Sequence, residues 1–325
     1  MKALVICAWI VVLLTGGIKG CFYYRSTYVP SITMEQPEMY SGNYTPFEKS
    51  ENLAHLDSKS TLKFSKDDDL PVLDGATALF PIYCSFVEAV YPKNCNIQDV
   101  VFFTKTSKAY ERLIEGKNDI IFVAEPSKQQ REMAKEKGIE FNMYPIGYEA
   151  FVFIVNRRNP VDSLTIQQIK DIYSGKITNW KEVGGRWQKI RPFQRPTNSG
   201  SQTAFVKVMG KDFDLIPPET HKVATSMGGM LDRVSDYENH DNAIGYTFRY
   251  FLETMNDSSE IKMLKINGVA PTRENIRNKT YPITDNFYAI TVKGRETENT
   301  KKLIEWIVSE QGQEIIDKVG YVPLN

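Results

Sequence analysis

Residues 70–90 read LPVLDGATALFPIYCSFVEAV, and this stretch points to the fold class. The apolar run at residues 70–73 is typical of a short buried strand, and residues 74–77 predict a turn. An apolar helix is expected over residues 78–90. Pro81 falls in its first turn, where proline is tolerated because its missing N–H would have no helical partner.

The same alternation continues along the chain. Apolar runs at residues 100–103 and 119–123 predict two further strands. A helix expected over residues 108–115 ends at Gly116, and another helix follows residues 125–127. Strands that alternate with helices predict an α/β fold, with a parallel sheet and helices on both of its faces. In such sheets ligands bind at the loops beyond the carboxyl ends of the strands.

A second set of elements begins near residue 148. A strand at residues 150–155 precedes a helix at residues 164–173, and the segment 243–246 is expected to cross back. A first lobe interrupted by a second one gives two crossing segments, a geometry that closes around a small ligand. The expected segments are 1–20 (signal peptide), 21–69 (tether or N-terminal extension), 70–147 (lobe one, first part), 148–246 (lobe two) and 247–325 (lobe one, second part).

Residues 195–203, RPTNSGSQT, place a cation just before a helix expected to run from Thr203 to Met209. A helix start carries unpaired backbone N–H groups and the positive end of the peptide dipole, so it attracts an anion. The residues just before this helix start add three features: a glycine that lets the backbone come close to a ligand, two hydroxyls, and a planar guanidinium suited to tetrahedral oxyanions. These residues are Arg195, Ser199, Gly200 and Ser201. No base accompanies the serines, so the stretch indicates binding and not catalysis.

The loops of the first lobe offer a facing set of hydroxyls. Each of three consecutive strand-to-helix loops carries a serine or threonine at a helix start. One such residue alone is typical of a helix cap. Three in succession, together with the Arg195 stretch, predict a second half of an anion site. The residues are Thr77, Thr106, Ser107, Glu125 and Ser127.

The composition excludes several classes. The chain has 325 residues, with 40 basic and 40 acidic side chains, so it lacks the basic surface of a nucleic-acid binder. Its hydrophobic fraction of 42% is enough for real cores. The three histidines are scattered without ligand spacing, so neither a metal site nor any other cofactor is expected.

The N-terminus has the form of an export signal. Lys2 precedes an apolar run at residues 3–14, which is too short to span a bilayer comfortably. Residues 18–21, IKGC, resemble the lipobox of bacterial lipoproteins, in which the cysteine is acylated, although Lys19 departs from the usual small or apolar residue. Lipidation of Cys21, secretion without a lipid and an uncleaved anchor all remain open.

The remaining cysteines and the N-terminal extension leave further alternatives. Cys84 and Cys95 either form a disulfide, which an exported compartment permits, or stay as two thiols. The first half of residues 22–70 is expected to be a tether. The later part, from Tyr44 to Phe64, has enough apolar residues to pack on a lobe.

Five motifs, in order over residues 70–325, resemble the phosphate-binding proteins of ABC phosphate importers. They are DGATA (74–78), YSGKITNW (173–180), R-xxx-SGS (195–201), AIGY (243–246) and the closing SEQGQ with GYVPL (309–324). The resemblance implies a type II periplasmic-binding-protein-like fold with the ligand cleft between two lobes. It also implies inorganic phosphate as ligand, the membrane subunits of an ABC importer as partners, an extracytoplasmic monomer, and attachment to the membrane through a lipid or signal anchor.

The resemblance carries the family's phosphate contacts onto named positions. They fall on Ala76, Thr77, Ala78, Thr106, Ser107, Arg195, Ser199, Gly200 and Ser201. In the third loop the family places an aspartate that accepts the ligand's proton, whereas this chain has Glu125, followed by Ser127. Glu125 either accepts that proton from one methylene further away or faces solvent and leaves Ser127 to bind.

Two other classes of function remain as alternatives. The tyrosine-rich extension permits a membrane-tethered sensor or adhesion module that reuses the binding-protein fold. Among importer components, the ligand is either phosphate or another oxyanion. An enzyme using Ser199 or Ser201 as nucleophile would need a base or a metal near these serines, which the sequence does not supply.

Overall fold

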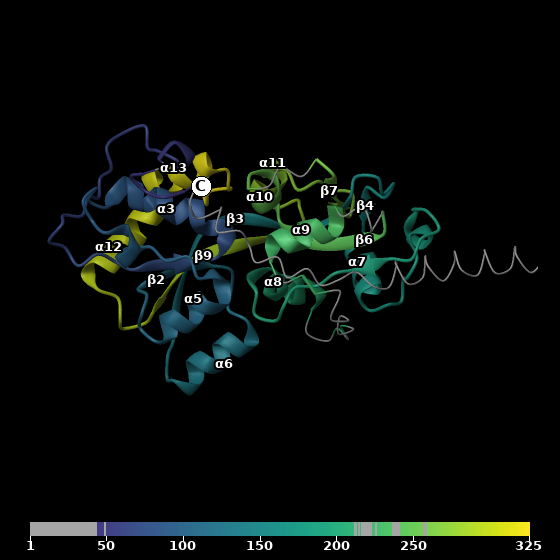
Figure 1. The fold of residues 1–325 in the computed structure, drawn as a ribbon, viewed down its shortest axis with the longest axis horizontal. Coiled ribbons are helices and arrows are strands. Elements are labelled where there is room, and N and C mark those ends of the chain that lie inside the picture. Colours follow the sequence, from purple (N-terminus) through teal and green to yellow (C-terminus); the bar gives the residue numbers. More distant parts are fainter. Residues whose placement is uncertain are drawn as a thin grey trace, which may run out of the picture.

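The computed structural model describes residues 44–48, 50–210, 213, 215, 223, 224, 226–235, 241–255 and 259–325. The expected signal peptide and Cys21 lie outside these residues. The described part of the chain forms two lobes joined by the strands β3 (Phe141–Asn156) and β9 (Thr284–Val292) (Figure 1). Within that part, no helix combines the length and the apolar character needed to cross a membrane.

Each lobe surrounds one end of the sheet. Lobe one contains η1 (Ser50–Asn52), β1 (Leu73–Gly75), η2 (Thr77–Leu79), α3 (Phe80–Val90), α4 (Ile97–Val100), α5 (Lys105–Ile114), β2 (Ile120–Val123), α6 (Lys128–Glu136), α12 (Glu298–Val308) and α13 (Glu310–Val319). Lobe two contains β4 (Ser163–Leu164), α7 (Ile166–Tyr173), η3 (Trp180–Val183), β5 (Arg191–Pro192), α8 (Gly200–Met209), α9 (Met227–Ser235), β6 (Ala243–Phe248), α10 (Arg249–Glu253), β7 (Ile261–Met263), β8 (Lys265–Ile266) and α11 (Arg273–Arg277).

The main sheet is mixed: β1 and β2 of lobe one pair in parallel, as predicted, but the prediction of a wholly parallel sheet is wrong because antiparallel strands join them. Its strand order is β1-β2-β9-β3-β6-β5, with β7 also paired to β3. β1 pairs with β2, and β5 with β6, in parallel, whereas β9 runs antiparallel to both β2 and β3. The physical reason is the double crossing. A chain that leaves a lobe and returns to it must run in opposite directions in its two crossing strands.

Strand β3 carries the connection. Its first part pairs with β9 from Phe141 to Ala150, and its last part pairs with β6 and β7 in lobe two. The β3–β9 register shifts between Pro145 and Gly147, as in a β-bulge. A Cβ at Gly147 would lie 2.6 Å from the ring of Phe287. Only glycine fits this position without a shift of its neighbours, because the Phe287 ring and the Val322 carbonyl occupy the space that a side chain would need.

The return to lobe one comes later than the sequence predicts. The expected boundary assigns residues 247–325 to lobe one. However, β7 pairs with β3 at Ile154–Asn156, and β8 pairs with β4, so both strands belong to lobe two. Figure 1 places α10, α11 and β7 on the same side as β6. The chain therefore crosses back in β9, because this strand pairs with β2 of lobe one on one edge and with β3 on the other.

Several expected elements form, and one does not. The helices α3, α7, α12 and α13 and the strands β2, β6 and β9 lie at or near their predicted positions. The prediction of a strand at residues 100–103 is wrong. Val100 is the last residue of α4, and Val101 makes a single bridge to Leu73. The Phe102 N–H donates to the Leu73 carbonyl at 2.8 Å, and Thr104 then binds the Asp74 side chain, so the segment lies beside β1 without forming a ladder.

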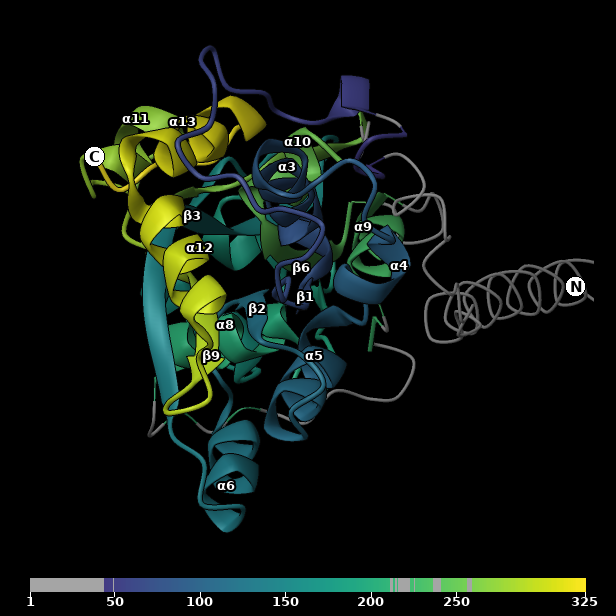
Figure 2. The same ribbon diagram turned by 90° about the vertical axis from the view of Figure 1, so that its left-hand side faces the viewer.

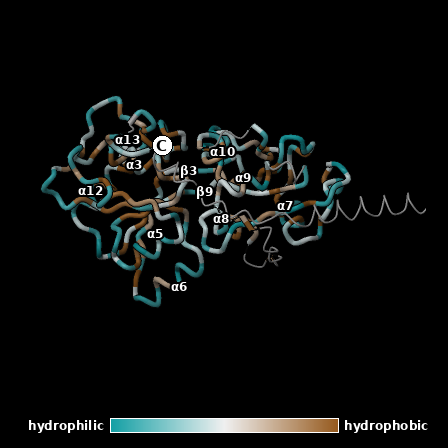
Figure 3. The backbone as a smooth tube through the Cα atoms, viewed as in Figure 1, coloured by the Kyte–Doolittle hydropathy of each residue, from teal (hydrophilic) through white to brown (hydrophobic). Residues whose placement is uncertain are grey.

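Aromatic side chains fill the cores of both lobes. In lobe one, Tyr83 stacks on Phe122, with ring centroids 5.2 Å apart. In lobe two, Phe205 stacks on Tyr246 at 4.5 Å, and Trp180 is buried as an anchor. Figure 3 shows hydrophobic residues along the interior strands and hydrophilic ones on the outer loops. These cores hold each lobe as a unit around the crossing strands.

The described extension before residue 70 packs on lobe one, as its composition predicts. Leu53 and Phe64 are buried there. The Ala54 N–H donates to Ser85 Oγ at 3.0 Å, and the Phe64 N–H donates to the Val90 carbonyl at 2.8 Å. This segment is therefore part of the folded lobe.

The two described cysteines are free thiols. Cys84 is buried in α3, and Cys95 is half-buried in the loop that follows. Burial raises the pKa of the Cys84 thiol well above its usual value. The structure thus realises the alternative of two separate thiols.

Candidate functional site

A cavity of about 580 Å³ lies between the two lobes. Lobe one lines it with residues at the starts of η2 and α5, and lobe two with residues at the starts of α8 and α9. The crossing strands close its base through Glu149 and Phe151 of β3 and residues 284–287 of β9. The cavity has the position expected for the ligand cleft.

Of the helix starts that line this cavity, three carry predicted site residues: those of η2, α5 and α8. η2 and α5 begin without a side-chain cap, and residues 76–79 and 105–107 at these starts line the cavity. α8 begins at Gly200, earlier than the predicted Thr203, with Ser199 as its N-cap. Uncapped N–H groups and the positive ends of helix dipoles favour an anion at the point where they converge.

Arg195 provides the fixed cation. Its backbone N–H donates to Gln202 Oε1 at 3.0 Å and to the Tyr246 hydroxyl at 2.9 Å. The residue as a whole is half-buried, but its Nε and Nη1 atoms are buried without a hydrogen-bond partner. Burial lowers the pKa of Arg195 to about 10, so the guanidinium stays charged at neutral pH. A buried, unpaired cation is costly unless an anion compensates it.

The two serines of lobe two have different surroundings. Ser199 Oγ accepts a hydrogen bond from the Gln202 N–H at 3.2 Å and so caps α8. Ser201 Oγ is buried and has no partner. Between them, a Cβ at Gly200 would lie 3.1 Å from Thr106 Oγ1 of lobe one. The glycine therefore allows the two halves of the site to approach each other.

Most of the predicted residues lie together around the cavity. Nine of them line it, and they come from both lobes. They are Ala76, Thr77, Ala78, Thr106, Ser107, Arg195, Ser199, Gly200 and Ser201. Thr77 and Thr106 are buried, whereas Ser107 is exposed.

Glu125 does not line the cavity. Its carboxylate accepts from Lys207 Nζ at 2.9 Å and pairs with Arg131 at 3.3 Å. Burial alone would raise the pKa of Glu125, but Lys207, Arg131 and the Tyr288 hydroxyl outweigh it and hold the pKa below its usual value. A carboxylate held ionised by two cations is poorly placed to accept a proton from a ligand. The geometry does not support the ligand contact expected for Glu125.

Ser127 also lies outside the cavity lining. Its hydroxyl caps α6 by accepting from the Gln130 N–H, and it donates to Asn198 Oδ1 of lobe two at 2.8 Å. The Gln130 side chain completes a capping box by accepting from the Ser127 N–H. The Ser-x-x-Gln spacing, visible in the sequence, indicates this capping role.

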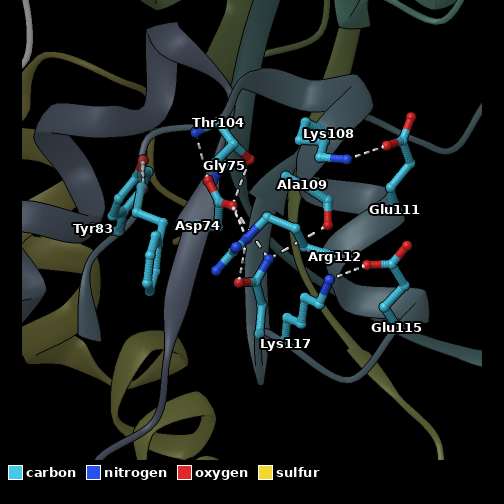
Figure 4. Close-up of polar contacts among 12 residues, drawn as sticks. Asp74, Gly75, Tyr83, Thr104, Lys108, Ala109, Glu111, Arg112, Glu115 and Lys117 are labelled. Carbon is cyan, nitrogen blue, oxygen red and sulfur yellow. Dashed lines mark hydrogen bonds and ion pairs between the residues drawn. The ribbon is translucent and has the colours of Figure 1, made fainter. Parts of the chain in front are cut away.

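Asp74 organises the site without lining it (Figure 4). Its buried carboxylate accepts from the N–H groups of Gly75 and Thr104 at 2.8 and 2.9 Å, and from Thr104 Oγ1 at 2.6 Å. Arg112 Nε lies 3.2 Å from the same carboxylate, and so does Asn118 Nδ2. Asp74 thereby ties the end of β1 to the start of α5, and fixes two of the three helix starts relative to each other.

Sequence reasoning missed several cavity residues. They are Lys105, Glu149, Lys207, Ser226, Met227 and Asp285. Lys105 adopts the left-handed backbone region, with φ of 68°, just before Thr106. Met227 begins α9, and Gly228 and Gly229 follow it in the first turn of that helix. None of these residues stands in a motif that separates it from an ordinary surface or core residue.

Glu149 is a buried carboxyl at the crossing. It accepts from the backbone N–H groups of Ala150 and Tyr250 at 2.7 and 3.3 Å, and Arg249 Nε lies 3.8 Å away. Burial outweighs these partners and raises the pKa of Glu149 to about 7.

The raised pKa of Glu149 predicts a pH-dependent stability. Between its unfolded value and about 7, the folded protein binds more protons than the unfolded chain. The Glu149 contribution is thus fully present below the unfolded pKa and is lost as the pH rises through about 7. We expect Glu149→Gln to flatten the fall in unfolding free energy over this window, measured by urea denaturation at several pH values. An unchanged slope would show that Glu149 is ionised throughout.

Known proteins share this fold and sequence pattern. A family model for the PBP superfamily domain matches residues 70–311. Protein SphX of Synechococcus elongatus is 26% identical over 271 residues, covering 78% of this chain and 77% of SphX. The phosphate-binding protein PstS of Bacillus subtilis is 27% identical over 259 residues, covering 78% of this chain and 80% of PstS.

A solved structure gives the same picture. A putative phosphate ABC transporter substrate-binding protein from Clostridium perfringens, determined with bound phosphate, superposes with a TM-score of 0.62 at 27% identity. The match covers 79% of this chain and 100% of that one. The superposition shows that the two chains share the same overall fold.

Proposed function

Because this chain belongs to the PBP superfamily, we propose that it is an extracytoplasmic solute-binding protein that captures inorganic phosphate for an ABC importer. The relatives named for phosphate binding and transport support this ligand. The ligand would lie between the lobes, in contact with residues from both.

One observation carries the proposal. The guanidinium of Arg195 has buried, unpaired Nε and Nη1 atoms, and Ser201 Oγ nearby in sequence is also buried and unpaired. Both line a cavity at which the starts of η2, α5 and α8 converge. A tetrahedral oxyanion would satisfy the charge, the hydroxyl and the helix N–H groups together.

The site favours binding over catalysis. Activation of a serine nucleophile requires a base within hydrogen-bond reach. Ser199 Oγ instead accepts from a backbone N–H, and Ser201 Oγ has no partner. Among the described residues, no three His, Cys, Asp or Glu side chains form a group that could hold a metal ion.

Calorimetry with the purified protein tests the ligand class. We expect phosphate to bind more tightly than sulfate or a phosphate ester from about pH 5 to about pH 8.5, a range in which phosphate exchanges a proton. Sulfate affinity equal to that of phosphate would make another tetrahedral oxyanion the ligand class. The absence of binding by any anion would favour a sensor or adhesion role for the fold.

The attachment to the membrane is a separate part of the proposal. The likeness of residues 18–21 to a lipobox supports acylation of Cys21 after cleavage of residues 1–20. Intact-mass spectrometry of the protein recovered from membranes would show the added acyl mass. A mass equal to that of the full or merely cleaved chain would contradict this anchor. Sedimentation would test the expected monomer.

A further inference from the structure

Asn198 links the anion-binding loop of lobe two to lobe one. Its Oδ1 accepts from Ser127 Oγ at 2.8 Å, and its Nδ2 donates to Gln129 Oε1 at 2.7 Å. Its carbonyl accepts from Gln130 Nε2 at 3.5 Å. Asn198 has a φ of 68°, a left-handed conformation that few residues other than glycine and asparagine adopt. All of these partners lie at the start of α6.

Ser127 has no proton left for a ligand. A hydroxyl has one donor hydrogen, and Ser127 donates it to Asn198. The same oxygen accepts from the Gln130 N–H at 3.2 Å. A direct hydrogen bond from Ser127 to an oxyanion would therefore require the contact with lobe two to break.

A second contact holds α8 to the same loop of lobe one. Lys207 of α8 pairs with Glu125 at 2.9 Å and with Asp285 of β9 at 2.6 Å. The side chains are 30–49% exposed, so solvent weakens each pair. Glu125 lies two residues before Ser127, so both contacts connect the third loop of lobe one to the Arg195–Met209 region. Figure 2 shows that α6 projects away from the rest of lobe one.

We propose that Ser127, Gln129, Gln130 and Asn198 form an interlobe clasp that positions the Arg195–Ser201 loop against the facing helix starts. Asn198 lies between Arg195 and the start of α8 in the sequence. The clasp therefore fixes both the Arg195 guanidinium and the α8 helix start. Ser127 and Asn198 are positioning residues and do not contact the ligand. This inference rests on the proposed capture of an anion in the cleft.

The clasp acts through the open and closed populations. Its hydrogen bonds exist only when the lobes are together, so they stabilise the closed form and not the open one. Loss of the clasp destabilises the closed, liganded form relative to the open one, and it weakens the apparent affinity by the factor by which that equilibrium shifts. Since opening precedes release, most of the effect should appear as faster dissociation.

Two variants test the clasp with phosphate as probe. Asn198→Gly removes the side chain but keeps the left-handed backbone accessible. Ser127→Ala removes the facing hydroxyl. We expect each to raise the phosphate dissociation rate about five- to tenfold in stopped-flow measurements, with a nearly unchanged association rate, as for one or two lost neutral hydrogen bonds.

Thr165→Ala is the matched control. Thr165 caps α7 through the same capping box, with Gln168 in place of Gln130, but its described hydrogen-bond partners, Gln168 and Ile169, belong to α7 itself. It should lower stability as Ser127→Ala does and leave phosphate dissociation unchanged. If Thr165→Ala accelerates dissociation equally, loss of a helix cap explains the effect and the clasp is overturned.

The double variant separates a clasp from a ligand contact. If Ser127 acts only through Asn198, adding Ser127→Ala to Asn198→Gly should cause no further loss of affinity. A further tenfold loss would place Ser127 on the ligand and overturn the inference. If the wild-type protein binds no anion, the proposed function fails. The clasp is then tested by small-angle scattering, where both single variants should have a larger radius of gyration than the wild type, and an equal radius would overturn it.

Discussion

Arg195→Ala should abolish high-affinity phosphate binding. Removing the buried guanidinium strands the anion without its cationic partner, at an expected cost of about 2–5 kcal/mol in binding free energy. This corresponds to a loss of affinity of roughly thirty- to several thousand-fold, measured by calorimetry. Arg195→Lys keeps the charge but loses the planar donor fork, so it should fall between the wild type and the alanine variant.

The same substitution should have a different effect on the unliganded protein. Nε and Nη1 of Arg195 are buried without partners, so the charge costs desolvation energy when no anion is bound. Arg195→Ala should therefore leave the unliganded melting temperature unchanged or higher, while the rise caused by phosphate disappears. Arg186→Ala is the control, because Arg186 pairs with Asp241 on lobe two and does not line the cavity. An Arg195→Ala variant that binds phosphate normally would remove the basis of the proposed function.

Local signals explain the part of the site that the sequence predicts. A cation before a Ser-Gly-Ser helix start, and a hydroxyl at the start of α5, are arrangements of neighbouring residues. They can be read without knowledge of the tertiary fold. What brings Gly200 to within reach of Thr106 is the approach of the two lobes. The order of the predicted elements and the resemblance to a two-lobe family both predict two lobes, but neither predicts this particular contact.

Non-local partners explain the parts that the sequence does not predict. The position of Glu125 depends on Lys207, which lies on the other lobe. The antiparallel direction of β9 depends on the second crossing, and the length of β3 depends on pairing with both lobes. Ser127 is an intermediate case, because its capping box is local but its contact with Asn198 is not.

Asp74→Ala should produce the largest loss of stability among the substitutions considered. The carboxylate is fully buried and accepts from backbone and side-chain groups of Gly75, Thr104 and Asn118, with Arg112 beside it. Its removal takes the acceptor from the N–H groups of Gly75 and Thr104 and the anionic partner from Arg112, whose Nε then keeps only Asn118 Oδ1 at 3.1 Å among these contacts. Breaking a buried ion pair from one side costs about 3–5 kcal/mol, which should appear as a lower midpoint in urea denaturation.

A neighbouring ion pair provides the control. Glu111→Ala removes the partner of Lys108 on the same helix, α5 (Figure 4). In this pair the Lys108 side chain is 57% exposed and the Glu111 side chain 38%. An exposed pair contributes at most about 1 kcal/mol, so its loss should barely move the midpoint. Asp74→Ala should also weaken phosphate binding, because Asp74 fixes the start of α5 that carries Thr106 and Ser107. If Asp74→Ala and Glu111→Ala had the same urea denaturation midpoint, the hydrogen bonds of Asp74 would not be needed to hold the starts of η2 and α5 at the cavity.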